Sequence, residues 1–520
     1  MALLLALGSP SLITFSLALT ILNARWINGK FRQVKEDSKD LRPRRPSQTQ
    51  AIKDARVFLI ESQHIPIQIV NGKRREFAQL VVCPENWAWW RSLRKEIRKT
   101  KREWTYSLYA QIGWVCASQL LAIVDFFTSA SFDTSIGIGL AINSLWIWMI
   151  PVVLGWVYVG TQTSAGSIKD AIASIVVPIL GLERNVTGEC IGLRDRTTFD
   201  EPYPHQRNIR LLFPRRAPAP GDPEQQLQPH LGREHLYPCS YLGFSIAGCE
   251  LEPGPIFNYA RTWSHMNAVR HVAEAFSAVT HRQKAKQTVD GRLWNDKPGR
   301  RDENLRGSPE ELSKYISIYE NGEDNPNFSV HGSSSPKLIL NCVHAAFMAI
   351  ILQWSSTGAA MVIAYKTPVV GLGCQSGSYL IYGIASTIAW LMLLMSASLS
   401  NRWSLQMEMP RPSPHFLLGP LAVLTRLIGK SLAAANALFL ITTSSVQFTG
   451  LYDTCWCDAC IPSLGRQAGW VVLFASDAQI AAASKGAWIG GVSMSVLSAA
   501  SITFYFLTSR GDEVFKRNEQ

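Results

Sequence analysis

The stretch that decides the fold class is Leu145–Val159, LWIWMIPVVLGWVYV, which contains no charged residue. It lies within a longer block, Ser135–Gly160, that is also free of Lys, Arg, Asp and Glu. The hydrocarbon core of a bilayer is about 30 Å thick, and a helix needs about 20 apolar residues to cross it. This block is therefore long enough to span a membrane.

Six further apolar blocks are similar in length and free of Lys and Arg. In chain order the seven blocks are Met1–Ala24, Tyr106–Ala130, Ser135–Gly160, Leu338–Tyr365, Ser378–Ser400, Ser431–Tyr452 and Gly486–Ser509. Gly8–Ser11 interrupts the first block, which is either a membrane anchor or a signal peptide. The absence of a basic start favours the anchor. A soluble protein would have to bury all seven blocks in its core, so the pattern predicts an all-α integral membrane protein with six or seven spans.

The composition agrees with a membrane protein that carries water-exposed segments. Hydrophobic residues make up 47% of the 520 residues and charged residues only 17%, whereas soluble proteins average about 25% charged residues. Ten cysteines over this length do not form the pattern of a small secreted disulfide scaffold.

The distribution of Lys and Arg predicts the orientation of the spans. Arg25–Thr105 contains 20 Lys and Arg against 9 Asp and Glu, which is typical of a cytoplasmic segment. Alternation of the spans then places Thr161–Lys337 in a large, partly helical cytoplasmic loop, with the N-terminus outside and the C-terminus cytoplasmic. The expected divisions are 1–24, 25–105, 106–160, 161–337, 338–509 and 510–520. The membrane itself, plasma membrane or endomembrane, is left open.

Four cysteines fall in the two larger outer connections of this topology: Cys374, Cys455, Cys457 and Cys460. Outer loops of a secretory-pathway protein face an oxidising compartment, so we expect disulfides, with Cys374 paired to one of the other three. Metal binding by CWCDAC with Asp453 and Asp458 is an alternative, although the spacing lacks the paired motifs of zinc sites. Free thiols are a third reading.

The segment Trp87–Trp104, WAWWRSLRKEIRKTKREW, predicts an amphipathic helix that runs into the second block. Trp90, Leu93 and Ile97 share one face, and Arg91–Arg102 supplies cations around it. Such a helix is typical of the membrane interface, with the aromatic rings at headgroup level and the cations on anionic lipid. A basic patch with aromatic residues also fits nucleic-acid binding, but the adjacent span favours the membrane, and we expect no nucleic-acid partner.

The long inner loop contains several distinct segments. Asn258–Lys286 predicts an amphipathic helix that packs on the spans or on the inner leaflet, and Ser308 followed by Pro309 predicts a helix start. Lys169–Gly181 is apolar but too short to span, and Phe213–His230 is a proline-rich linker. Two glycosylation sequons begin at Asn185 and Asn327, and the predicted topology leaves both unmodified.

Motifs for nucleotide binding or nucleophilic catalysis are absent from the sequence. We therefore expect no catalytic residue, cofactor or bound metal. Polar residues inside spans are functional candidates, and four are noted here: Asp125, Asn143, His344 and Asn436. Asp125 lies near the end of its block, where it could reach the interface.

Five segments stand out together: SLALTILNARW at Ser16–Trp26, QHIPIQI at Gln63–Ile69, AIVDFFTSA at Ala122–Ala130, GPIFNYAR at Gly254–Arg261 and CWCDAC at Cys455–Cys460. In this order and context they resemble a family of uncharacterised multi-pass membrane proteins of filamentous fungi. The resemblance covers nearly the whole chain and implies an integral membrane protein. It implies no activity and no site residue.

The leading functional hypothesis is a non-enzymatic membrane protein with a receptor-like, scaffolding or organising role and cytoplasmic protein partners. The alternative is a transporter or channel, which requires a polar intramembrane pathway lined by residues such as Asp125, Asn143, His344 or Asn436. A membrane-embedded enzyme is the second alternative and requires His or carboxylate groups gathered at one depth.

Overall fold

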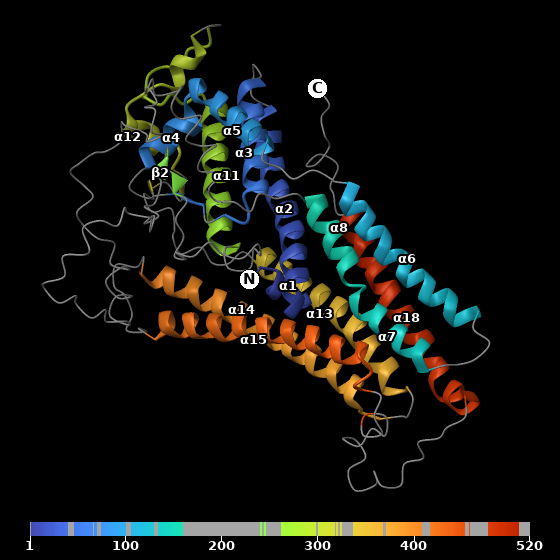
Figure 1. Ribbon diagram of the computed structural model, residues 1–520. Coiled ribbons are helices and arrows are strands. Elements are labelled where there is room, and N and C mark those ends of the chain that lie inside the picture. The colour runs from blue at the N-terminus through green and yellow to red at the C-terminus, as the bar shows by residue number, and fades with distance from the viewer. Residues whose placement is uncertain are drawn as a thin grey trace, which may run out of the picture.

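A computed structural model of the protein shows a bundle of long helices joined to a smaller helical domain (Figure 1). It describes residues 2–39, 46–65, 67–69, 74–99, 106–128, 134–159, 240–241, 244–245, 262–297, 300–317, 319–320, 323–324, 336–367, 371–407, 417–452, 457 and 477–508. Within these ranges the strands are only two residues long. The regular structure is therefore almost entirely helical.

Six helical segments of the described chain are long and apolar enough to cross a membrane. They are α2 (Pro10–Lys39), α7 with α8 (Thr134–Trp146 and Met149–Val159), α13 (Pro336–Tyr365), α14 (Cys374–Met407), α15 (Leu418–Phe448) and α18 (Asp477–Thr508). A further helix, α6 (Tyr106–Thr128), has a shorter apolar part at Ile112–Asp125. The prediction of an all-α membrane bundle with six or seven spans is confirmed.

Helix α2 occupies the centre of the bundle. Of its apolar window, 83% is buried inside the protein, against 50% or less for the other five segments. Its first half carries buried small and polar side chains, namely Ser11, Thr14, Ser16, Thr20 and Asn23. Small and hydroxyl side chains let helices approach closely inside a membrane. A helix surrounded by protein does not need a lipid-compatible surface, which explains its modest hydropathy.

The second half of α2 enters a separate core, which we call the helical domain. Its other helices are α3 (Pro46–Glu61), α4 (Arg74–Val82), η2 (Pro84–Asn86), α5 (Trp87–Lys99), α11 (Thr262–Lys284), η5 (Arg301–Leu305) and α12 (Pro309–Tyr315). The Trp90 ring lies at its centre, with ring centroids 6.3 Å from Phe58 and 5.9 Å from Phe276. Ile27, Phe31 and Val34 of α2 join the same core. The described parts of the predicted segments 25–105 and 161–337 therefore contribute to one core.

The position of helix α5 corrects the prediction that its aromatic face lies at the membrane interface. The amphipathic pattern is right, but its tryptophans do not face lipid, because Trp89 and Trp90 are buried in the protein core with α3 and α11. The opposite face remains cationic and exposed at Arg91 and Lys95. An amphipathic sequence indicates that one face is covered, not whether protein or lipid covers it.

The two helices expected in the inner loop are present. Helix α11 lies within Asn258–Lys286 and packs on the second half of α2, in the helical domain rather than on a leaflet. Helix α12 begins as expected at Ser308, whose hydroxyl accepts from the Glu311 backbone N–H, while the Glu311 carboxylate accepts from the Ser308 N–H. This capping box satisfies two backbone donors that the first turn leaves without partners.

Short strands complete the helical domain. β1 (Gln68–Ile69), β3 (Phe244–Ser245) and β2 (Ser240–Tyr241) form an antiparallel sheet in the order β1-β3-β2, with Gln68 opposite Ser245 and Tyr241 opposite Phe244. β4 (Tyr319–Glu320) and β5 (Glu323–Asp324) form a hairpin. The predicted segments Lys169–Gly181 and Phe213–His230 and both sequons lie outside the described residues.

Three contacts identify the helix ends that lie beside the helical domain, which we call the domain side. Arg25 donates to the Tyr505 hydroxyl at the end of α18, at 3.1 Å. The His64 and Trp156 rings, the latter near the end of α8, have centroids 5.2 Å apart. Leu338, at the start of α13, belongs to the domain core. Helix α13 leads away from the domain side, so the start of α14 lies at the opposite end of the bundle, which we call the far side.

Candidate functional site

The most polar part of the bundle is the break between α1 (Ala2–Gly8) and α2. Helix α1 ends at Gly8, and Ser9 separates it from α2. The Asn436 side-chain N–H group of α15 donates to the Gly8 carbonyl at 2.8 Å and to the Tyr382 carbonyl of α14 at 3.1 Å. Carbonyl groups at a helix end have no partner within the helix. Asn436 therefore satisfies one of the carbonyls that the break exposes.

Further hydrogen bonds extend this cluster across α14 and α13. The Tyr382 hydroxyl donates to the Leu7 carbonyl at 2.6 Å, and Ser9 donates to the Ser386 carbonyl at 3.0 Å. Ser386 donates to the Gln353 side-chain oxygen at 3.2 Å. We call Ser9, Gln353, Tyr382, Ser386 and Asn436 the polar cluster; every member is buried.

Close packing fixes the position of the break. A Cβ atom added to Gly8 would lie 1.7 Å from the Ala433 carbonyl oxygen of α15. Glycine is therefore required where α1 meets α15. The polar cluster contains hydroxyl and amide groups and no ionisable carboxyl, amino or imidazole group, so it can hold helices together or bind a small polar group.

The four intramembrane residues predicted as functional candidates do not converge. Asn436 is buried in the polar cluster, Asn143 is half-buried on α7, and His344 is exposed on the outer surface of α13. Asp125 is exposed three residues before the end of α6, as expected for a group near the interface. They therefore do not line one common pathway.

The other members of the polar cluster were not predicted from the sequence. Gln353 and Ser386 each lie within an uncharged block. Their polarity was the one feature of the sequence that could have marked them as candidate site residues. Ser9 was noted only as part of an interruption. Their grouping depends on how α1, α13 and α14 cross, which residue spacing within one helix does not reveal.

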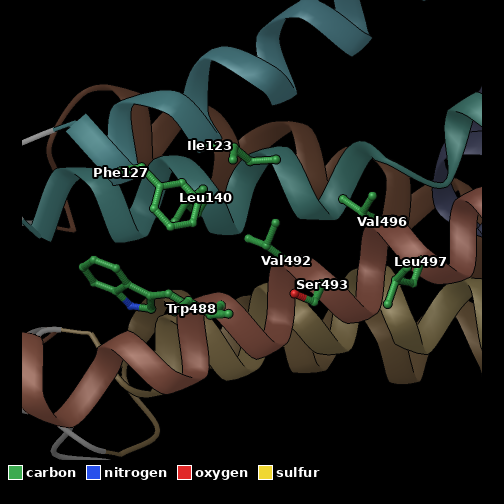
Figure 2. Close-up of a pocket in the computed structure, with 9 residues that line it drawn as sticks. Ile123, Phe127, Leu140, Trp488, Val492, Ser493, Val496 and Leu497 are labelled. Carbon is green, nitrogen blue, oxygen red and sulfur yellow. The ribbon is translucent and has the colours of Figure 1, made fainter.

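A second feature is an apolar crevice between α6, α7 and α18, with a volume of about 300 Å³. Figure 2 shows its lining, in which eight of the nine residues are apolar: Ile123, Phe127, Leu140, Trp488, Ile489, Val492, Ser493, Val496 and Leu497. Phe127 and Leu497 are 71% and 66% exposed. Because α7 and α18 belong to the helices long and apolar enough to cross a membrane, the open side of the crevice lies on an apolar surface of the bundle.

Trp488 forms a fixed wall of the crevice. Its indole N–H donates to the Thr367 hydroxyl at 2.7 Å, and Thr367 in turn donates to the Ile363 carbonyl at 2.9 Å. A Cβ atom on Gly137 of α7 would lie 2.5 Å from the Trp488 ring. The ring is thus held between α7 and the end of α13, while the opposite side of the crevice is open.

At the far side of the bundle, Cys374 and Cys457 form a disulfide. Both residues were disulfide candidates, and the bond joins the start of α14 to the chain after α15. The Ser378 and Tyr452 hydroxyls lie 3.2 Å apart nearby, and Tyr379 donates to Gln447 at 3.2 Å. Cys455, Cys460, Asp453 and Asp458 lie outside the described residues.

The helical domain contains buried ionisable groups of its own. Arg94 of α5 donates to the Asp54 carboxylate of α3 at 2.7 Å, and Gln50 donates to the same oxygen at 2.9 Å. The His265 ring is fully buried, and its Nε2 lies 2.8 Å from the Leu59 carbonyl. Burial lowers the pKa of His265 to about 4, and the hydrogen bond to Leu59 opposes this shift only in part.

A surface contact links two parts of the helical domain. The Arg306 guanidinium donates to the Glu85 carboxylate at 2.6 and 3.0 Å. Partial burial acts to raise the pKa of Glu85, but hydrogen bonds from its own backbone and from Arg306 outweigh burial and lower that pKa. Both side chains are more than half exposed, so the pair contributes little to stability.

Among the described residues, no three His, Cys, Asp or Glu side chains are grouped as metal ligands would be. No protein-family model, curated protein or solved structure matches the chain. The candidate sites come from the geometry alone: they are the polar cluster, the apolar crevice and helix α2, whose two halves belong to different cores.

Proposed function

We propose that the protein is a non-enzymatic membrane protein with a receptor-like or organising role, in which the bundle and the helical domain respond together. The observation that carries the proposal is the continuity of α2. Its residues Phe15 and Leu19 belong to the bundle core, and Ile27 and Phe31 belong to the domain core, within one helix of 30 residues. We infer that α2, as a helix shared by two cores, transmits rotation or displacement between them.

The polar cluster gives the bundle end of α2 a defined position. Asn436 and Tyr382 hold the end of α1, and Ser9 links the start of α2 to α14. A ligand or partner that shifts α14 or α15 would therefore act on α2 directly. On the domain side, α2 packs against α3 and α11, and the exposed side chains of α5, such as Arg91 and Lys95, would be accessible to partners.

The test changes a residue near the bundle end of α2 and measures the effect in the helical domain at its other end. Asn436→Leu removes both donated hydrogen bonds, and amide hydrogen exchange in α5 and α11 is measured by mass spectrometry in lipid nanodiscs. We expect faster exchange in both helices than in the wild type. Inserting two glycines between Arg25 and Trp26 should remove this response, because it interrupts α2 between the cores.

The matched control inserts the same glycines between Arg42 and Pro43, after α2 has ended, and should keep the response to Asn436→Leu. If exchange in α5 and α11 is insensitive to Asn436→Leu in the uninterrupted protein, the two parts are not coupled and the proposal fails.

The break at Ser9 favours a transporter as the second candidate function. Discontinuous helices near polar groups form the substrate sites of many transporters. A water-filled pathway would make Ser9→Cys reactive toward small water-soluble thiol reagents from one side of the membrane. If the polar cluster is instead packed and free of a water pathway, Ser9→Cys should not react, in keeping with the burial of Ser9.

The proposed partners follow from the surfaces. The apolar helices contact the lipid bilayer, and the domain side would face the cytoplasm, where protein partners would bind. The exposed cations of α5, which include Arg91 and Lys95, precede the start of α6 by a short connection and would meet anionic lipid at the bilayer surface.

A further inference from the structure

The apolar crevice has a defined length and direction. On α18 its lining recurs at Ile489, Val492, Ser493, Val496 and Leu497, which lie on one helical face at about 100° per residue. From Ile489 to Leu497 this face extends about 12 Å at 1.5 Å per residue. One leaflet of the hydrocarbon core is about 15 Å deep. The crevice therefore matches the depth of a single leaflet.

A cation stands at the far-side end of this face. Lys485 precedes Ile489 by four residues, so it lies on the same face one turn closer to the start of α18, and it is exposed. It is the second residue of the apolar segment Ser484–Thr508, which places it at headgroup level. Asp125 is excluded from this surface, because it lies about 200° around α6 from both Ile123 and Phe127.

We propose that the crevice is a binding site for one glycerophospholipid, with an acyl chain between α6 and α18 and the phosphate group beside Lys485. The occupant follows from the surroundings: the open side faces the bilayer, the lining is apolar, and a cation at its end attracts a phosphate. Fixed by Thr367 and Gly137, Trp488 gives the chain a preformed wall. The site would exist whether the protein acts as a receptor or as a transporter.

The experiment uses the whole protein in phosphatidylcholine nanodiscs with a phosphatidylglycerol probe that carries a photoreactive diazirine in its acyl chain. After illumination, adducts are located by peptide mass spectrometry. We expect them to concentrate at Ile489–Leu497 and Ile123–Phe127. A diacylglycerol probe with the same chain should label more weakly, and Lys485→Gln should abolish this difference.

A pair of variants tests the crevice itself. Ser493→Trp fills the crevice from an exposed position and should lower labelling of α18 about tenfold, equivalent to about 1.4 kcal/mol. Met494→Trp adds the same ring at the next exposed position, about 100° away and outside the lining, and should leave labelling unchanged. Equal elution volumes of both variants on size-exclusion chromatography show that folding is preserved.

Two results would overturn the proposal. If adducts spread over other lipid-facing positions such as Ile388 of α14 in proportion to their exposure, and Ser493→Trp has no effect, the lipid is only part of the surrounding annulus. If the diacylglycerol probe labels as strongly as the phospholipid, the site does not recognise phosphate.

Discussion

His265 gives the helical domain a pH-dependent stability. Its neutral ring is buried with Nε2 donating to the Leu59 carbonyl, and its pKa is about 4, below the ordinary value of 6.5. Above pH 6.5 the ring is neutral in both the folded and unfolded states. Between pH 6.5 and 4 the unfolded state binds a proton that the folded state does not, so stability falls as the pH falls. The loss approaches about 3 kcal/mol near pH 4.

The prediction is that His265→Gln flattens the loss of stability between pH 6.5 and 4. The glutamine amide can donate to Leu59 but does not titrate, so the variant loses some stability at pH 7 and less at low pH. Urea unfolding in detergent, followed by tryptophan fluorescence, measures the free energy at each pH. His281→Gln changes an exposed residue of the same helix and should retain the wild-type profile. An unchanged profile in His265→Gln would contradict the assignment.

At the residue scale, individual polar residues within the apolar blocks could be recognised from the sequence, but the residues that they contact could not. Asn436 was recognised as an intramembrane polar residue, and it occupies the polar cluster. The same criterion selected His344, which is exposed on the surface of the bundle. A polar residue within an apolar block is unusual, but its polarity does not show whether it faces protein or lipid. That depends on where the neighbouring helices pack.

At the scale of elements, hydropathy located the apolar helices but did not indicate which of them is most buried. Gly8–Ser11 interrupts the first block, which could also have been a signal peptide, yet α2 is the most buried of the six apolar segments. The features that weaken its hydropathy, small and hydroxyl side chains, are the ones that allow other helices to pack around it. A central membrane helix can thus score lower than a peripheral one.

Helix α5 shows the complementary limitation. Its pattern of Trp90, Leu93 and Ile97 predicted a helix with one covered face, and that face is buried. The cover comes from α3 and α11, and α11 lies more than 160 residues along the chain. Local periodicity does not reveal contacts between segments so distant in sequence. The apolar face of α5 was therefore predicted to contact lipid, because a span follows it in the chain.

At the scale of the whole molecule, the helical domain joins two segments of the chain that α6, α7 and α8 separate. The domain draws α3, α4 and α5 from the segment before α6, and α11 and α12 from the segment after α8. Both segments were placed on the same side from charge and span count alone. The predicted spans at α6 and at α7 with α8 would leave this side and return to it, so the prediction puts an even number of crossings between the two segments.

This arrangement predicts that two exposed positions lie on opposite sides of the membrane. Leu293 belongs to the helical domain and is 97% exposed, and Leu451 follows α15 on the far side and is 63% exposed. The excess of Lys and Arg in Arg25–Thr105 predicts that the domain is cytoplasmic. A membrane-impermeant maleimide on intact cells should therefore label Leu451→Cys directly and Leu293→Cys only after permeabilisation, as located by peptide mass spectrometry. Labelling after full denaturation controls for expression. Labelling of both positions on intact cells would refute the predicted alternation of spans. Labelling of Leu293→Cys alone would show that the orientation is inverted. The Cys374–Cys457 disulfide would then lie in the cytosol, where thiols are kept reduced.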